Sequence, residues 1–106
     1  MRINRFRNGN FNIKFEKEDF DHREGTLINV INALYDYDCS IFGEEYCLSN
    51  YDMAIDLYCY YTDMLVRIPY RLLNDLEDGK TIKLYARKLT LDDREEYDRL
   101  IELGEL

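Results

Sequence analysis

The stretch from Tyr51 to Ile68 constrains the fold most, because its pattern fits two different secondary structures. Its residues alternate with a period of two, which is typical of a half-buried strand followed by a turn at Thr62–Asp63 and a second strand that stops at Pro69. With a period of 3.6 residues, the same stretch would be a helix that Ser49 caps. We favour two strands, because alternating and aromatic residues favour strands. The first strand would place Met53, Ile55, Leu57, Cys59 and Tyr61 on one face and Asp52, Ala54, Asp56, Tyr58 and Tyr60 on the other.

The N-terminal segment predicts a β-hairpin around Asn8–Gly9, a dipeptide that favours tight turns between strands. Downstream of this turn the apolar residues alternate regularly, whereas upstream Ile3 and Phe6 differ in parity and can share a face only across a bulge. The segment is also basic, which either protects an edge strand or forms a patch that docks on the chain's own acidic face. The alternating residues are Phe11, Ile13 and Phe15, and the cations are Arg2, Arg5, Arg7 and Lys14.

A helix is predicted after Thr26, which can cap its first turn. Apolar residues then recur at a helical period and form one stripe, which Ile28 and Tyr35 widen. The helix should end between Tyr35 and Asp38, and the residues from Ser40 to Ser49 should form a loop or an irregular crossing. The stripe consists of Leu27, Val30, Ile31 and Leu34.

Three shorter elements complete the predicted fold. A short helix follows Pro69, and a strand runs from Thr81 to Leu89. A last helix opens at Thr90, where Asp93 three residues later completes a capping box. The strand would point Ile82, Leu84 and Ala86 inward and Lys83, Tyr85 and Arg87 outward, and the last helix would point Tyr97, Leu100 and Ile101 inward.

These elements predict an α+β fold for residues 1–106 as a single domain. A chain of 106 residues can bury enough apolar surface to fold without metal or disulfide bonds. Its content of 46% hydrophobic and 34% charged residues is typical of a globular protein. We expect a small antiparallel sheet with helices packed on one face, in the approximate order ββαββαβα.

The formal net charge of −8 limits the kinds of partner. Nucleic acids and anionic membranes repel such a surface at long range, so neither is expected as a direct ligand. A basic protein is the natural complement. The sequence has neither a basic segment leading into an apolar run at its start nor about 18 consecutive apolar residues, so we expect a cytoplasmic protein with no membrane association.

The cysteines Cys39, Cys47 and Cys59 are expected to be free, reduced and buried, because an odd number does not suit a disulfide framework. Their spacing matches no zinc motif, and His22 is the only histidine, so no metal or other cofactor is expected. The chain also contains no phosphate-binding loop and no hydrolase or metalloprotease motif. We therefore expect a protein that is not an enzyme.

Binding residues are suggested by the segment from Glu24 to Val66, which contains no Lys or Arg but many carboxylates and tyrosines. Tyrosine supplies a large contact area with a polar end and is enriched at interfaces. Carboxylates spaced among aromatic rings can imitate the phosphates and bases of a nucleic acid and occupy a basic channel. The alternative is a solvated acidic face on a domain whose function lies elsewhere. The candidate partner-binding residues are Tyr35, Asp36, Tyr37, Asp38, Glu44, Glu45, Tyr46, Asp52, Asp56, Tyr58 and Tyr60.

The small size, the acidity and the tyrosine-rich middle resemble the general character of phage-encoded inhibitors, including anti-CRISPR proteins that block Cas nucleases. The resemblance is one of composition over Glu24 to Val66 and transfers no residue roles. It implies a non-enzymatic inhibitor that binds stoichiometrically to the basic nucleic-acid site of a nuclease or DNA-binding protein. The basic segments 1–14 and 80–88 depart from a pure DNA mimic and leave room for a homodimer in which basic and acidic faces meet.

Two other classes of function fit the same sequence. One is a small bacterial regulatory or accessory protein that oligomerises or binds a partner through an apolar patch. The other is an antitoxin or immunity-type protein that caps a basic toxin. Neutralising the carboxylates should slow association with a basic partner but not association through an apolar patch, so the salt dependence of binding separates these classes.

Overall fold

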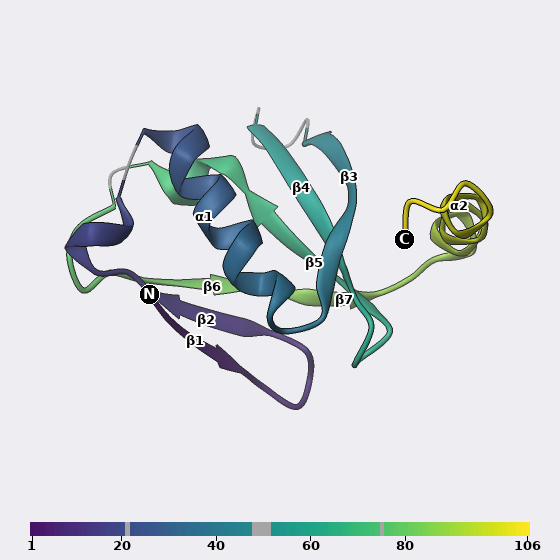
Figure 1. Ribbon diagram of the computed structural model, residues 1–106, viewed down its shortest axis with the longest axis horizontal. Helices are drawn as coiled ribbons and strands as arrows, with labels where there is room; N and C mark the ends of the chain where they lie inside the picture. Colours follow the sequence, from purple (N-terminus) through teal and green to yellow (C-terminus); the bar gives the residue numbers. More distant parts are fainter. Residues whose placement is uncertain (21, 48–51, 75) are drawn as a thin grey trace.

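The computed structural model describes residues 1–20, 22–47, 52–74 and 76–106 as an α+β fold with two antiparallel sheets. The first sheet has the strand order β1-β2-β6 and the second has the order β3-β4-β5-β7 (Figure 1). The strands are β1 (Arg2–Arg5), β2 (Phe11–Lys14), β3 (Cys39–Cys47), β4 (Asp52–Cys59), β5 (Met64–Pro69), β6 (Thr81–Leu84) and β7 (Ala86–Lys88). The helices are α1 (Arg23–Tyr35) and α2 (Leu91–Glu102), and two short 3-10 helices are η1 (Lys17–Asp19) and η2 (Tyr70–Leu73).

We predicted the element order ββαββαβα with one sheet, and this prediction is wrong in two places. The segment that was expected to be a loop after the first helix forms β3, which pairs along its length with β4. The expected strand from Thr81 to Leu89 is divided at Tyr85, so that β6 pairs with β2 in one sheet and β7 pairs with β5 in the other. One continuous run of chain therefore joins the two sheets.

The core lies between α1 and the two sheets. The predicted stripe of α1 is buried, and it packs with residues from β2, β4, β5 and β6. Ile28 and Tyr35 were expected to widen this stripe, but both are exposed, because the helix buries only one narrow face. In Figure 1, α1 lies over the middle of the molecule, whereas α2 lies at the far end beyond β3 and β4.

The cap of α1 also differs from the prediction. His22 is the N-cap, and its Nδ1 accepts a hydrogen bond from the backbone N–H of Gly25 at 3.0 Å. Thr26 lies inside the first turns and is buried. At α2 the predicted capping box is present, because Thr90 Oγ1 accepts from the N–H of Asp93 and the Asp93 carboxylate accepts from the N–H of Thr90. Ile101 was expected to point inward, but it is exposed.

The strand interpretation of the ambiguous stretch is confirmed. β4 and β5 form an antiparallel pair, with a turn that contains Asp63 at a φ of 53°. Tyr61 was expected to face inward with Cys59, but β4 ends at Cys59 and Tyr61 lies in the turn, 74% exposed. The alternative helix cap Ser49 lies outside the described residues, as does Tyr51.

The N-terminal hairpin is also confirmed, and it explains the parity of Phe6. β1 ends at Arg5, so Phe6 belongs to the turn and is exposed. Gly9 in this turn has a φ of 91°, and a Cβ added there would lie 3.0 Å from the Cβ of Ala86. A glycine is therefore needed where the hairpin packs against β7.

Candidate functional site

The end of α1 and the turn between β4 and β5 form one surface. The backbone N–H of Tyr60 donates to the carbonyl oxygen of Asp38 at 3.0 Å, which holds the two segments side by side. Asp38 has a φ of 62°, a left-handed conformation that aspartate adopts more readily than most residues. We call this surface the tyrosine–aspartate end, and its exposed members are Tyr35, Asp36, Asp38, Tyr60 and Tyr61.

Arg5 of the N-terminal hairpin contacts the tyrosine–aspartate end. Its guanidinium lies 4.4 Å from the ring centroid of Tyr61 and 5.7 Å from that of Tyr37, and its Nη1 donates to the carbonyl oxygen of Tyr37 at 3.1 Å. Tyr37 itself is partly buried, and its hydroxyl donates to the carbonyl oxygen of Ile3 at 3.3 Å. A cation from the basic N-terminal hairpin thus contacts the tyrosine-rich segment, and Tyr37 acts as a structural residue rather than as part of the exposed surface.

Asp56, another predicted binding residue, is 6% exposed and lies in an ion-pair network on the face of β4 that points away from α1. Its carboxylate accepts two hydrogen bonds from Arg67, at 2.9 and 3.1 Å, and lies 3.8 Å from Arg87. Arg67 also pairs with Glu45, and Arg87 pairs with Asp93 of α2 at 2.6 Å. Hydrogen bonding to Asp56 raises the pKa of Arg67, and hydrogen bonding to Arg87 lowers the pKa of Asp93. These carboxylates therefore already form ion pairs with arginines of the same chain.

Tyr58 is also buried, because α2 covers it. Its ring centroid lies 4.8 Å from that of Tyr97 and 5.1 Å from that of Tyr60, and its hydroxyl donates to Asp63 at 2.6 Å. Burial and this hydrogen bond raise the pKa of the Tyr58 hydroxyl. Asp63 in turn pairs with Arg94 of α2. The alternation that placed Asp56 and Tyr58 together on one face was correct, but α2 and the ion pairs cover that face.

The remaining predicted residues lie at the opposite end of the β3-β4 ladder. Glu44 accepts a hydrogen bond from the hydroxyl of Tyr70 at 2.8 Å, and burial together with this bond raises the pKa of Tyr70 to about 12. Asp52 accepts from the backbone N–H groups of Met53 and Arg71. Tyr46 is exposed. The structure therefore divides the candidates among the tyrosine–aspartate end, the ion-pair network around Arg67 and the far end of the β3-β4 ladder.

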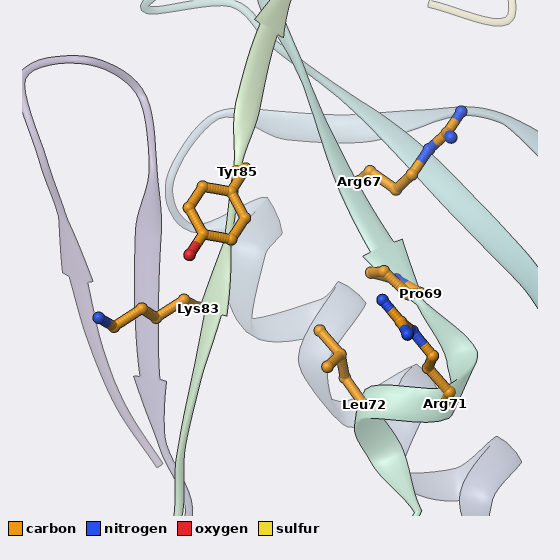
Figure 2. A pocket seen from close by; sticks show the side chains of 6 residues that line it. All are labelled: Arg67, Pro69, Arg71, Leu72, Lys83 and Tyr85. Atoms are coloured by element: carbon orange, nitrogen blue, oxygen red, sulfur yellow. The ribbon is translucent and has the colours of Figure 1, made fainter. Parts of the chain in front are cut away.

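The structure also contains a cavity that the sequence did not predict. A cavity of about 220 Å³ lies between η2 and β6, and we call it the cationic cleft. Figure 2 shows that the Arg71 side chain extends toward Pro69, that the Tyr85 ring lies on the β6 side, and that the Arg67 guanidinium points away from the cleft. The outward alternation of Lys83 and Tyr85 was visible in the sequence, but nothing indicated that η2 would face them. The lining residues are Arg67, Pro69, Arg71, Leu72, Lys83 and Tyr85.

Cys39 and Cys59 are both buried, and their Sγ atoms lie 2.6 Å apart across β3 and β4. The two residues are direct partners in the ladder. The hydrogen bond between the sulfur atoms and burial raise the pKa of the Cys39 thiol. Cys47 was also expected to be free and buried, but its side chain is outside the described part of the structure.

Within the described residues, no group of three or more His, Cys, Asp or Glu side chains is placed to hold a metal ion. Neither helix in the described part of the chain is long and apolar enough to cross a membrane. Comparisons of the chain with known protein families, with curated proteins and with solved structures found no match.

Proposed function

We propose that this protein is a non-enzymatic inhibitor that binds the basic nucleic-acid-binding surface of a partner, such as a nuclease or a DNA-binding protein. The binding surface in this proposal is the tyrosine–aspartate end. One observation carries the proposal: three tyrosines at this end, Tyr35, Tyr60 and Tyr61, expose 46%, 44% and 74% of their surface beside Asp36 and Asp38, which form no ion pair with the described residues.

The distribution of ion pairs supports this choice of surface. Among the described residues, the ion pairs involve Asp19, Glu45, Asp56, Asp63, Asp93 and Glu96 but neither Asp36 nor Asp38. Carboxylates that already have an internal cation contribute less to the field felt by a partner. The net charge of −8 would attract a basic protein from a distance, and the unpaired carboxylates would then meet its cations directly.

The tyrosines would supply the contact area. The backbone of Tyr60 is held by its hydrogen bond to Asp38, and the guanidinium of Arg5 lies over one face of the Tyr61 ring. Fewer side-chain conformations are then lost on binding than for freely rotating rings. A surface of this kind suits a groove in which bases normally stack and phosphates normally pair with Lys or Arg.

The experiment that tests this proposal compares two double variants as baits in a pull-down from a bacterial lysate at low salt. Asp36→Asn with Asp38→Asn removes two charges from the tyrosine–aspartate end. Asp92→Asn with Glu95→Gln removes two charges from exposed positions on α2 and serves as the matched control. The proposal expects the first pair, but not the second, to lose a basic nucleic-acid-binding partner. Equal recovery by both variants would reject the tyrosine–aspartate end as the binding surface.

A second candidate function, an accessory protein that acts as a homo-oligomer, is favoured by β3. This strand spans nine residues, has a partner on one side only, and exposes Ile41. A long edge strand can pair with a second copy, although the irregularity between Ile41 and Gly43 and the charges of Glu44 and Glu45 oppose such pairing. Light scattering after gel filtration tests the accessory role, which requires an oligomer, and a monomer at all concentrations would reject it.

A further inference from the structure

The outer face of the first sheet carries positive charge and no negative charge. Alternation along β1, β2 and β6 turns one set of side chains into the core under α1 and leaves the other set on the opposite side. On that outer side Arg2 and Lys14 are direct cross-strand partners, and Lys83 is the partner of Asn12. Figure 2 shows the Lys83 side chain extending toward the β1-β2 hairpin. We call this surface the basic sheet face, and its members are Arg2, Asn4, Asn12, Lys14, Thr81 and Lys83.

The cations of the basic sheet face have no counter-charge in their own molecule. Segments 1–15 and 80–88 contain no Asp or Glu, and within the described residues Arg2, Lys14 and Lys83 form no ion pair. Like charges directly opposite each other on a sheet are destabilising. Protection of a sheet edge explains a cation on β1, but Lys14 lies on the central strand β2, which has no free edge. The fold therefore gathers positive charge at a cost that edge protection does not explain.

The outer face of α2 has the opposite charge. Tyr97 and Leu100 turn toward the protein, whereas the carboxylates on the other side of the helix are exposed and form no ion pair with the described residues. Glu95, Asp98 and Glu102 follow one another at helical spacing, so like charges are neighbours on the helix surface and destabilise it. The helix dipole also disfavours a carboxylate in the last turn, where Glu102 lies. We call this surface the acidic helix face, and its members are Asp92, Glu95, Asp98 and Glu102.

The two faces lie apart in one molecule, so they can meet only between molecules. In Figure 1, α2 lies at one end of the long axis, beyond β3 and β4, whereas β1 and β2 lie toward the other end. An exposed apolar side chain adjoins each face: Leu91 precedes the acidic helix face, and Tyr85 follows Lys83 of the basic sheet face. These side chains can add apolar contact area to the charge pairs.

We propose that the acidic helix face of one molecule docks on the basic sheet face of a second copy. A second copy is the occupant because the chain itself carries the complementary surface, whereas the net charge of −8 repels nucleic acids and anionic membranes. Salt at about 0.1 M screens the overall repulsion between two copies beyond about 10 Å, while opposite charges in contact still attract. Different surfaces of the two copies meet, so repeated contacts build rings or chains. The contact uses neither the tyrosine–aspartate end nor the edge of β3, so it stands or fails independently of the proposed inhibitor role.

The test is sedimentation equilibrium of the intact protein up to millimolar concentration, with two charge-reversed variants measured alone and mixed. Lys14→Glu with Lys83→Glu reverses the basic sheet face, and Glu95→Lys with Glu102→Lys reverses the acidic helix face. The unmodified protein should associate at about 0.1 M salt and dissociate at about 1 M. Each variant alone should associate at least about tenfold more weakly, because both of its faces then have the same sign. An equal mixture of the two variants should regain the affinity, because each face then meets one of opposite charge.

Recovery in the mixture also excludes a simple loss of folding, because mixing cannot restore a misfolded variant. Lys17→Glu with Lys88→Glu reverses the same amount of charge at exposed positions outside both faces and is the matched control, which should associate like the unmodified protein. Equal weakening by this control would show that net charge, and not the two faces, determines the affinity. An unmodified protein that stays monomeric at millimolar concentration, or variants that associate alone as tightly as it does, would overturn the proposal.

Discussion

Cys39 and Cys59 face each other directly beneath the tyrosine–aspartate end, with their Sγ atoms 2.6 Å apart. Cys39 follows Asp38, and Cys59 precedes Tyr60. Because Tyr60 N–H donates to Asp38, the cysteines occupy a non-hydrogen-bonded pair of the ladder, where Cα atoms of opposite residues come closest. The two free thiols therefore lie where the two segments that carry the proposed binding surface pair with each other.

This relationship predicts how the thiols react. Because Cys39 and Cys59 are buried, their thiols should react slowly in the folded protein with a reagent that labels exposed thiols. Incubation with oxidised glutathione should join them, each sulfur losing one hydrogen while the oxidant is reduced to two glutathione thiols. A disulfide across this 20-residue separation should stabilise the protein by about 3 kcal/mol.

The measurement is intact mass with peptide mapping in a Cys47→Ser background, combined with urea unfolding of the oxidised and reduced forms. The control is Cys39→Ser, which should form only a mixed disulfide or none. If the disulfide-linked protein were less stable than the reduced protein, the facing arrangement in the folded protein would be wrong.

A second prediction concerns Asp56. Asp56→Asn should destabilise the protein by about 2–4 kcal/mol, because it leaves Arg67 half-buried without its main carboxylate partner. Glu45→Gln removes the other carboxylate from the same guanidinium, but Glu45 is exposed, so its cost should stay below about 1 kcal/mol. Urea unfolding of the two variants provides the comparison, and similar losses would contradict the central place of Asp56 in the network.

A third prediction concerns the hairpin turn. Gly9→Ala should destabilise the protein by about 1–3 kcal/mol, because alanine disfavours a φ of 91° and its methyl group would press on Ala86. Gly43→Ala is the matched control, because a Cβ at Gly43 meets no atom within 4 Å. Thermal unfolding of the two variants tests the difference, and a harmless Gly9→Ala would place the hairpin farther from β7 than the structure has it.

A fourth prediction links pH to stability through Asp63. The hydrogen bond from Arg94, followed by that from Tyr58, lowers the pKa of Asp63 in the folded protein. The folded state then binds fewer protons than the unfolded state in acid, so the stabilisation is present above the ordinary pKa of about 4 and is lost as the pH falls through the lowered value.

Arg94→Gln should therefore raise the pKa of Asp63 and flatten the acid limb of the stability curve. Arg99→Gln, which removes a cation that pairs with Glu96 on the same helix, should leave the pKa of Asp63 nearly unchanged. Carboxyl NMR titration gives the pKa values directly. An unchanged pKa of Asp63 in Arg94→Gln would show that α2 does not dock on the β4-β5 turn in solution.

Local patterns in the sequence predicted much of this fold. The Asn8–Gly9 turn, the buried stripe of α1, the capping box at Thr90 and the β4-β5 pair all rest on residues close together in the chain. β3 was missed because Gly43, Glu44 and Glu45 are poor strand formers, and the strand is stabilised by pairing with β4. The division at Tyr85 was missed because it depends on which sheet each half of the strand joins.

The candidate site was predictable to a smaller extent. Alternation placed Asp56 and Tyr58 on the same face of β4, but only the tertiary structure shows that α2 covers this face. Tyr61 was assigned inward because the sequence does not show that β4 ends at Cys59, two residues earlier. The cationic cleft lies between η2 and β6, and no pattern along the chain indicates that these two elements line one cavity.

The most direct test of the central claim uses the captured partner and double-stranded DNA as a competitor. A complex held through a nucleic-acid-binding surface should be displaced by DNA, and its association rate should fall steeply as salt shortens the electrostatic range from about 10 Å at 0.1 M toward about 3 Å at 1 M. Asp36→Asn with Asp38→Asn should lower that rate and reduce its salt dependence. A complex that DNA leaves intact and that forms equally fast at high salt would contradict the proposed role of the tyrosine–aspartate end.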